Sequence, residues 1–273
     1  GTGIALIGSM VLGFWLTTRA LKPIEDITRS AAQITAADDL KTRLSWNGPM
    51  DELGELVSVF NGAMERLQHL FNVQQRFVAD VSHELRTPLT AITGNVELIK
   101  RYGMDTESLD AIESETHRMS RLVNDLLLLA RADNGELKLN LEELDLDIIV
   151  GEAYREARIL AKDRPLNIVM AEFEPVRIVG DSDRLKQLLS NLVGNAIKFT
   201  PDGGQITISL QKTEHDAVIR VKDTGIGISP EHVQRIFDRF YQADASRVKT
   251  SSDGEGAGLG LSIARWIVEA HGG

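Results

Sequence analysis

The chain has 273 residues, and 42% of them are hydrophobic, which is ordinary for folded protein and leaves room for several small modules. Its formal net charge is −10, and its 30 Lys and Arg residues are scattered rather than clustered. This charge pattern argues against nucleic acid as a main partner. The absence of cysteine excludes disulfides and thiolate metal sites.

The first sixteen residues, GTGIALIGSMVLGFWL, are uncharged and mostly apolar. A complete membrane span needs about 20 such residues, so we interpret residues 1–18 as the inner part of a truncated transmembrane helix. Neither an initiator methionine nor a basic leader precedes it, which disfavours a signal peptide. Trp15 would lie at the membrane interface, with Arg19 on the cytoplasmic side. The alternative is a buried helix of a soluble domain.

Two amphipathic segments follow, each with apolar residues at alternating steps of three and four. The first has Ile24, Ile27, Ala31 and Ile34, and the second has Leu53, Leu56, Phe60, Ala63, Leu67 and Leu70. Short helices of this kind cannot bury their apolar stripes alone, so the pattern predicts a parallel helical dimer. Pro23 with Glu25, and the run Asp51-Glu52-Leu53-Gly54, resemble the helix starts of a HAMP signal-relay domain, which would span residues 19–72. The alternative is a plain coiled-coil linker.

The next helical pattern, FVADVSHELRTPLTAITGNVELI from Phe77 to Ile99, carries one histidine that should face water. Its apolar stripe is as wide as that of a helix in a four-helix bundle and contains Phe77, Val78, Val81, Leu85, Leu89, Ile92, Val96 and Ile99. His83 falls at the outermost heptad position, with Glu84 beside it and Thr87 one turn further on the same face. Pro88 lacks an amide donor, so we expect the helix to bend or loosen just after His83.

An exposed imidazole beside a carboxylate is a plausible nucleophile, because it is neutral near pH 7 and can pass its second proton to the acid. Taken alone, a surface histidine next to a glutamate is more often ordinary helix decoration. The pair also opens an HExxH zinc-protease pattern, but Thr87 stands where the second histidine is required. One side-chain ligand does not make a zinc site.

A second long helix is expected after a turn at Tyr102-Gly103. Its heptad positions hold Leu109, Ile112, Thr116, Met119, Val123, Leu126 and Ala130, with Leu122, Leu127 and Leu129 beside them. Asn134-Gly135 should end this helix. Two antiparallel helices with wide stripes are half of a four-helix bundle, and a homodimer would complete it. We therefore predict a dimerisation domain over residues 73–135.

From about Glu136 the pattern changes from heptads to alternating strands and helices. Helices are expected over residues 148–162 and 184–199, and strands over 166–170, 176–179, 205–210 and 217–221. This order predicts an α+β sandwich with helices over a mixed sheet, spanning residues 136–273. Three motifs in this region carry the chemistry.

The first motif is a polar face on the helix DSDRLKQLLSNLVGNAIKFT. Gln187, Asn191, Asn195 and Lys198 are spaced by four, four and three residues, so they share one side of the helix. A neutral amide oxygen suits Mg²⁺, which keeps water and phosphate oxygens as its other ligands, and the lysine adds a positive charge for phosphate. Alone, such a face is more often merely solvated.

The second motif, Asp223-Thr224-Gly225-Ile226-Gly227, directly follows the strand pattern AVIRVK. A carboxylate at the end of a strand can accept a hydrogen bond from an adenine amino group, and glycines let the backbone approach the base closely. The motif is weak alone, because glycine turns follow many strands.

The third motif is the run GEGAGLGL from Gly254 to Leu261, which leads into the apolar helix pattern Ser262–Ala270. Glycine-rich backbone at a helix start presents amides and a positive dipole end to phosphate. The run is neither a Walker loop nor a Rossmann fingerprint. The long polar segment before it contains Phe237 and Phe240, and such a segment is typical of a lid that closes over nucleotide.

The run SHELRTPLTAI resembles the H-box of bacterial sensor histidine kinases, in which the histidine is autophosphorylated from ATP. The downstream motifs, in their order and spacing, look like the N, G1, F and G2 boxes of the ATP-binding domain of that family, which has a Bergerat-type fold. By this resemblance Glu84 is the general base for His83. Thr87 would help to position water when the kinase acts as a phosphatase.

The resemblance also implies roles in the nucleotide site. Asn195 would bind Mg²⁺ with Asn191 nearby, Lys198 would contact phosphate, and Asp223 would read adenine. The other residues that the resemblance places in the ATP pocket are Phe199, Gly225, Gly227, Phe237, Phe240, Gly256, Gly258, Leu259 and Gly260.

The sequence departs from the family pattern at three places. Gln242 stands where arginine is common in the F-box, so phosphate stabilisation would fall to Arg239 or Arg247. Ala257 stands where threonine or serine is common, which removes a hydroxyl contact. The chain stops at Gly273, where relatives continue into further strands, so we expect a sheet without its last strands.

Together these features predict a homodimeric sensor histidine kinase anchored in the bacterial inner membrane, with its catalytic region in the cytoplasm. Its cofactors would be ATP and Mg²⁺. His83 would pass its phosphoryl group to an aspartate in the receiver domain of a response regulator, and no nucleic acid is expected as a partner. Two alternatives remain: a Bergerat-fold ATPase whose conformational cycle does the work, and a non-catalytic membrane signalling scaffold.

Overall fold

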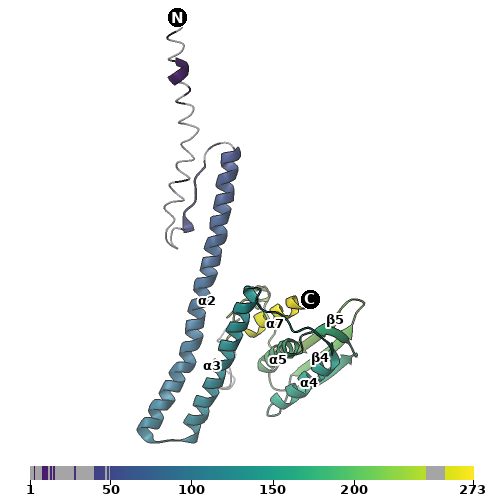
Figure 1. Cartoon of the computed structure of the whole chain (residues 1–273). Helices are drawn as coiled ribbons and strands as arrows, with labels where there is room; N and C mark the ends of the chain where they lie inside the picture. The colour runs from purple at the N-terminus through teal and green to yellow at the C-terminus, as the bar shows by residue number, and fades with distance from the viewer. Residues whose placement is uncertain are drawn as a thin grey trace. The chain divides into compact units, whose positions relative to one another are not determined.

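A computed structural model describes residues 3, 8–11, 13, 15, 28, 40–46, 48, 50–243 and 256–273 (Figure 1). The chain divides into two compact units, Gly1–Ser82 and His83–Gly273, whose boundary lies inside one long helix. The expected transmembrane helix and the first HAMP helix lie almost entirely outside the described residues. In the part of the chain that is described, no helix combines the length and the apolar character that a membrane crossing requires.

In the first unit, a short extended segment is held against the start of helix α2, Glu52–Tyr102. The Leu44 amide donates to the side-chain oxygen of Asn61 at 2.9 Å, and the Asn61 amide nitrogen donates back to the Leu44 carbonyl at 3.0 Å. Leu44 and Val57 are both buried. Asp51 begins the helix, because its carboxylate accepts the amide of Gly54 at 3.1 Å. The contacts of Leu44 therefore hold residues 42–46 against α2.

Helix α2 is continuous for 51 residues, so the expected second HAMP helix and the expected helix that carries His83 are one element. Pro88 lies within it and is buried, and the helical assignment is not interrupted there. The bend expected after His83 stays a prediction. The helix ends where it was expected to, at Tyr102, and Gly103 follows with φ of 96°, a left-handed conformation that favours glycine.

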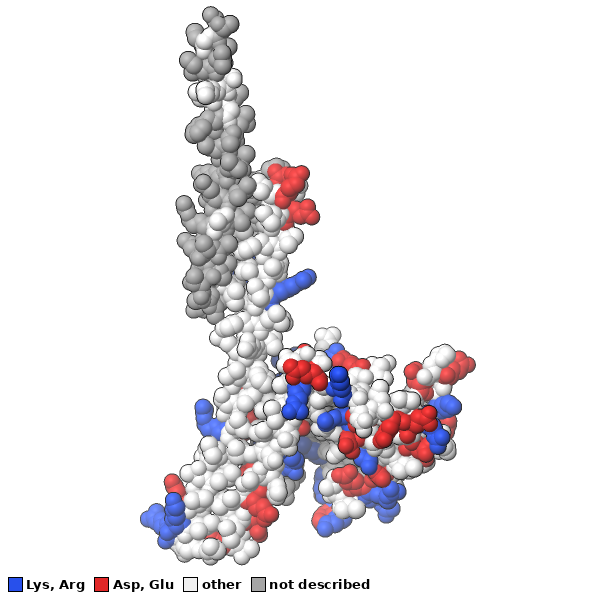
Figure 2. Space-filling model, in the orientation of Figure 1, with Lys and Arg blue, Asp and Glu red and all other residues white. Residues whose placement is uncertain are grey.

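Helix α3, Thr106–Asp133, returns antiparallel to α2 (Figure 1). The Asp105 carboxylate caps its start by accepting the Ser108 amide at 2.7 Å, and this bond lowers the pKa of Asp105. The helix ends before Asn134 and Gly135, as predicted. We call α2 and α3 from His83 to Asp133 the stem. In Figure 2 the face in view is uncharged along the middle of the stem, with charged residues at its edges and its lower end. Large apolar side chains that remain exposed on it are Leu89, Leu98, Leu109, Val123 and Leu127.

The region after the stem contains five strands and four helices within the described residues, and one of these helices is a single turn. The helices are α4 Leu146–Leu160, α5 Ser182–Phe199 and α7 Gly260–Ala270, with one further turn of helix, α6 Pro230–Val233. The strands are β1 Glu142–Asp145, β2 Asn167–Phe173, β3 Arg177–Gly180, β4 Gln205–Lys212 and β5 Ala217–Asp223. Strand β4 lies between β2, which is parallel to it, and β5, which is antiparallel. The predicted mixed sheet is therefore confirmed, but β1 and β3 form a separate antiparallel pair.

One hydrophobic core joins the helices of this region to the sheet and to the end of the stem. Helix α5 packs against both α4 and α7 (Figure 1), and Ile206, Ile208 and Leu210 of β4 are fully buried beneath them. Leu122, Leu128 and Leu129 of α3 belong to the same core. The second half of α3 is therefore packed against the strands and helices that follow it, and these elements share one core with the end of the stem.

A pH dependence follows from this packing. Burial raises the pKa of Asp125 on α3 to about 6, although Arg121 acts in the opposite direction. Asp125 faces Gln187 of α5, whose side-chain nitrogen lies 3.5 Å from its carboxylate. Between about pH 4 and pH 6 the folded state binds more protons than the unfolded state, so stability falls as the pH rises through that window.

The Asp125→Asn variant removes this titration. Its unfolding temperature should exceed that of the wild type near neutral pH and should depend less on pH between pH 4 and pH 7. Thermal unfolding followed by circular dichroism measures both values. An unchanged pH dependence in the variant would show that other groups produce it.

Candidate active site

The His83 side chain is exposed on α2, as predicted. Glu84 beside it is half-buried, and its carboxylate lies 3.9 Å from the guanidinium of Arg118 on α3. Arg118 also lies 3.8 Å from the carboxylate of Glu115. The hydroxyl of Thr87 donates to the His83 carbonyl at 3.4 Å. The stem therefore presents an open imidazole whose neighbouring carboxylate is held near an arginine of the second stem helix.

Helix α5 begins at a tightly bonded carboxylate. Asp181 accepts the Arg184 amide at 3.1 Å and the Asn140 amide at 2.9 Å. Burial acts to raise the pKa of Asp181, but these hydrogen bonds outweigh it and leave the pKa below its ordinary value. The Asp181 amide donates in turn to Nε2 of His271 at 3.0 Å, and Nδ1 of His271 lies 2.7 Å from the Ile267 carbonyl. His271 thus ties the end of α7 to the start of α5.

The polar face of α5 divides between two neighbours. The amide nitrogen of Asn191 donates to the Gly260 carbonyl at 3.1 Å, which joins the helix to the glycine segment. Gln187 lies on the same face, but it contacts Asp125 of the stem and accepts a hydrogen bond from Arg184 at 2.8 Å. Gln187 is therefore engaged by the stem, and only the part of the face from Asn191 to Lys198 remains as a candidate for nucleotide binding.

The last turn of α5 meets the turn that follows β5. The Ile226 amide donates to the Phe199 carbonyl at 3.3 Å. A Cβ atom on Gly225 would lie 2.4 Å from the same carbonyl oxygen, so only glycine fits there. Asp223 is exposed at the strand end, where its carboxylate accepts the Gly225 amide at 2.8 Å. Nζ of Lys198 lies 5.3 Å from the centre of the Phe199 ring.

The phenylalanine segment and the glycine segment are bonded to each other. The Phe240 amide donates to the Gly258 carbonyl at 3.0 Å, and the Gln242 side chain donates to the Gly256 carbonyl at 3.0 Å. Phe240 has a left-handed φ of 58°, which is unusual for a bulky residue. It packs on the core, whereas Phe237 is 39% exposed. The lid was expected over the polar segment that contains Phe237 and Phe240. Residues 228–243 of this segment are described, whereas residues 244–253 lie outside the described residues.

Arg239 was one of two expected substitutes for a missing phosphate-binding arginine. Its guanidinium instead makes two hydrogen bonds, of 2.8 and 2.5 Å, to the carboxylate of Asp133 at the end of α3. Two parallel bonds of this kind are among the stronger polar contacts in proteins. Arg239 is therefore engaged by the stem in this structure. Arg247, the other expected substitute, lies outside the described residues.

The donor set of α5 fits a magnesium ion held jointly with phosphate. Asn191 directs its amide nitrogen toward Gly260, so its oxygen is the atom left for a cation, and Asn195 is half-buried one turn further on. Among the described residues, no group of three His, Cys, Asp or Glu side chains could hold a metal. A magnesium ion at this site would therefore depend on neutral amide oxygen together with phosphate and water oxygens.

Three family models match the chain. A HAMP domain matches residues 15–69, a His Kinase A (phospho-acceptor) domain matches residues 73–135, and a histidine kinase-, DNA gyrase B-, and HSP90-like ATPase matches residues 180–273. The phospho-acceptor match contains the exposed His83, and the ATPase match contains α5 and both glycine motifs. The chain belongs to the two-component sensor histidine kinases.

Individual histidine kinases support this assignment. The chain is 36% identical over 253 residues to the sensor histidine kinase CusS of Escherichia coli strain K12, a match that covers 91% of this chain and 52% of CusS. It therefore spans about half the length of that relative. The histidine kinase ThkA, solved in complex with the response regulator protein TrrA, has a TM-score of 0.57 and 26% identity, with 82% of this chain and 62% of that chain covered. Full-length ShkA in complex with AMPPNP has a TM-score of 0.53 and 32% identity, with 72% and 41% covered.

In this sensor kinase the contacts gather the predicted residues into two groups. One is the stem group of His83, Glu84 and Thr87. The other lies around α5, where Asn191 contacts Gly260, the Phe199 carbonyl receives the turn after Asp223, and Phe240 is bonded to Gly258. None of the contacts described above joins His83 to the second group. His271 was missed, because a histidine that bonds only to backbone carries no recognisable spacing signal.

Proposed function

We propose that this chain autophosphorylates His83 from Mg-ATP and passes the phosphoryl group to an aspartate of a response regulator. The single observation that carries the proposal is that an exposed histidine beside a carboxylate lies on the same chain as three segments, expected to bind nucleotide, that hydrogen bonds join around α5. The length of chain shared with CusS and the similarity to ShkA bound to AMPPNP support it.

The nucleotide would lie between the end of α5 and the two glycine motifs. Asn195 and Asn191 would offer oxygen to Mg²⁺, Lys198 would face phosphate, and Asp223 would accept the adenine amino group. When bound, Mg²⁺ supplies positive charge to the phosphate oxygens during transfer. The remaining residues that would line the pocket are Phe199, Gly225, Gly227, Phe237, Phe240, Gly256, Gly258, Leu259 and Gly260.

The transfer step needs few protein groups. A ring nitrogen of His83 attacks the γ-phosphorus of ATP, the bond from phosphorus to the ADP oxygen breaks, and ADP leaves. The other ring nitrogen gives its proton to Glu84, which Arg118 holds beside the histidine. When the kinase acts as a phosphatase, Thr87 would position the water that removes the phosphoryl group from the response regulator.

The stem would provide both the homodimer interface and the docking surface for the response regulator. Its apolar side chains, including Leu89, Leu98 and Val123, remain exposed in the single chain, and a second stem would cover them in a four-helix bundle. ThkA was solved with a response regulator protein, which supports a receiver domain as the partner here. Residues 73–135 would form this dimerisation and phosphotransfer domain, and residues 136–273 the ATP-binding domain.

The HAMP match and the sensor kinase relatives support attachment to the bacterial inner membrane. Residues 1–18 would belong to the membrane helix and residues 19–72 to the HAMP domain that relays its movement. The catalytic region would then lie in the cytoplasm, where ATP is available.

Labelling with ATP radioactive at the γ-phosphate tests the proposal. The protein should acquire label that is stable in base and labile in acid, as a phosphoramidate is. Release of phosphate without any protein label would instead favour a Bergerat-fold ATPase. Absence of both nucleotide binding and label would favour a non-catalytic scaffold.

A further inference from the structure

The end of α5 leaves a backbone acceptor that the helix itself cannot satisfy. In a continuing helix the Ile197 carbonyl would accept the amide of residue 201, but that residue is Pro201, which has no amide hydrogen. The preceding carbonyl, of Ala196, is satisfied twice, by the Thr200 amide at 3.1 Å and by the Thr200 hydroxyl at 2.6 Å. The Ile197 carbonyl therefore needs a donor from elsewhere in the chain.

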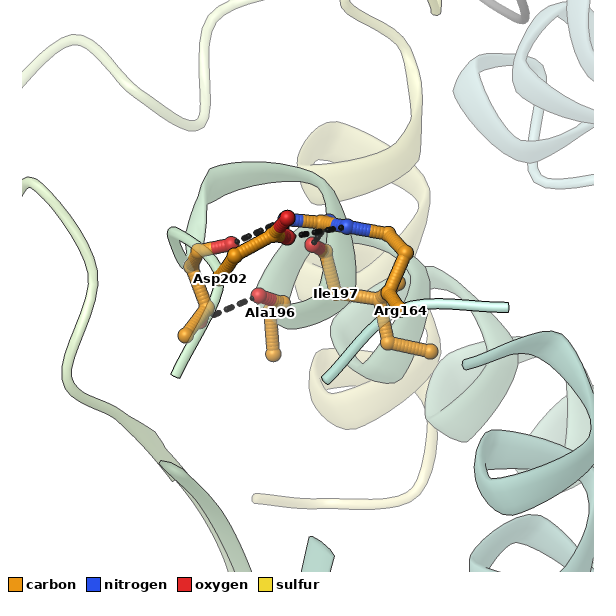
Figure 3. Close-up of polar contacts among 5 residues, drawn as sticks. Arg164, Ala196, Ile197 and Asp202 are labelled. Atoms are coloured by element: carbon orange, nitrogen blue, oxygen red, sulfur yellow. Dashed lines mark hydrogen bonds and ion pairs between the residues drawn. The ribbon is translucent and has the colours of Figure 1, made fainter. Parts of the chain in front are cut away.

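Arg164, in the loop between α4 and β2, supplies that donor (Figure 3). Its Nη1 donates to the Ile197 carbonyl at 2.6 Å, and its Nη2 donates to the Thr200 carbonyl at 2.8 Å. Asp202 also pairs with the guanidinium, because its carboxylate accepts Nε at 3.0 Å and Nη2 at 2.8 Å. The Arg164 side chain is about one-third exposed, whereas that of Asp202 is mostly exposed. A cation at the carboxyl end of a helix is also favoured by the helix dipole.

The turn that Arg164 holds is part of the nucleotide site. It carries Lys198, and on its other side the Phe199 carbonyl receives the turn after Asp223 through the Ile226 amide. Two backbone hydrogen bonds also attach the loop after α5 to the chain that follows Arg164. The Gly203 amide donates to the Pro165 carbonyl at 2.8 Å, and the Asn167 amide donates to the Gly204 carbonyl at 2.9 Å.

The segment after α5 is also hydrogen-bonded to the turn that follows Asp223. The Gln205 amide donates to the Thr224 hydroxyl at 2.9 Å, and the Thr224 amide donates to the Gln205 carbonyl at 3.0 Å. Thr224 is the neighbour of Asp223. Movement of the last turn of α5 would therefore displace Lys198 and Asp223 relative to each other.

We propose that Arg164 is a positioning residue for nucleotide binding, which fixes the last turn of α5 between the phosphate and adenine sides of the site without touching the nucleotide. This inference rests on the proposed function. Arginine suits the role because its planar fork reaches both carbonyl oxygens at once. A lysine has one compact charge and cannot keep both carbonyl contacts in place.

The test measures the dissociation constant of Mg-ATP by calorimetry on the intact chain, well below its unfolding temperature. Arg164→Gln should weaken binding about tenfold, which corresponds to the loss of one charge-assisted hydrogen bond. Arg164→Lys should recover part of the affinity. At saturating ATP, the rate of labelling should change by less than about twofold, because the reacting groups are unaltered.

Two matched controls isolate the carbonyl contacts. Lys162→Gln removes a positive charge from the same loop, where Lys162 is 70% exposed and pairs only weakly with Asp163. Asp202→Asn weakens the ion pair but leaves both carbonyl bonds of Arg164. Both controls should bind Mg-ATP as the wild type does.

Other results contradict the inference in separate ways. If Arg164→Gln lowers only the unfolding temperature and leaves the affinity unchanged, Arg164 is a structural cap. If Lys162→Gln weakens binding equally, general charge explains the effect, and if Asp202→Asn does so, the ion pair rather than the carbonyl contacts carries it. Failure of the wild type to bind Mg-ATP would overturn the proposed function itself, together with this inference.

Discussion

Replacement of His83 by glutamine is expected to reduce labelling from γ-labelled ATP to background while nucleotide binding stays unchanged. Glutamine keeps a polar side chain of similar length at an exposed position, so the stem should fold normally. It has no ring nitrogen that could attack phosphorus, and no other group in the stem motif can take over that role. Labelling by autoradiography and Mg-ATP binding by calorimetry measure the two properties separately.

The chain offers a matched control for this variant on the other stem helix. His117 is also exposed, and its ring lies 3.7 Å from the carboxylate of Glu113. It therefore has the same general surroundings, a surface histidine near a glutamate on a helix, but it lies outside the H-box motif. His117→Gln should be labelled as strongly as the wild type. Loss of label in both variants, or in neither, would contradict the role assigned to His83.

Gly258→Ala should be the most destabilising of the simple glycine substitutions in the glycine motif after the lid. Gly258 has φ of +70°, and a Cβ atom there would lie 2.8 Å from the Phe240 carbonyl carbon and 2.9 Å from its Cα. These neighbours are backbone atoms that no rotation of a side chain can move. Left-handed strain and the clash together should cost about 3 kcal/mol.

The unfolding temperature measures this effect, and it should fall by roughly 6–12 °C for a chain of this size. Gly256→Ala is the matched substitution two residues earlier, where no atom of the described residues lies within 4 Å of the added Cβ and the backbone is not left-handed. It should leave the unfolding temperature nearly unchanged. Equal stability of the two variants would show that the bond between Phe240 and Gly258 does not hold the two segments together.

Local patterns in the sequence were sufficient for much of the fold. The apolar stripes predicted both stem helices, and the left-handed conformations of Gly103 and Gly135 agree with the expected helix ends. Helix α5 and strands β2 to β5 were also expected near their observed positions. Strand β1 was missed, because the run EELD has no apolar alternation and becomes a strand only by pairing with β3.

The contacts that complete the site were harder to predict, because their partners lie far apart in the chain. Asn191 and Gly260 were both expected in the nucleotide site, but only the fold shows that one donates to the other. Arg239 illustrates the opposite outcome, since its sequence context suggested phosphate and its guanidinium binds Asp133, 106 residues earlier. Arg164 carried no signal, because the need for it arises from Pro201 and from a carbonyl acceptor on another element.

The most direct test of the account is to locate the phosphoryl group itself. The protein is incubated with Mg-ATP, digested under alkaline conditions that preserve phosphohistidine, and the peptides are sequenced by tandem mass spectrometry. A phosphoryl group is expected on His83 and on no other histidine. A phosphoryl group on a different residue, or an unmodified His83 peptide in protein that binds and consumes ATP, would contradict it.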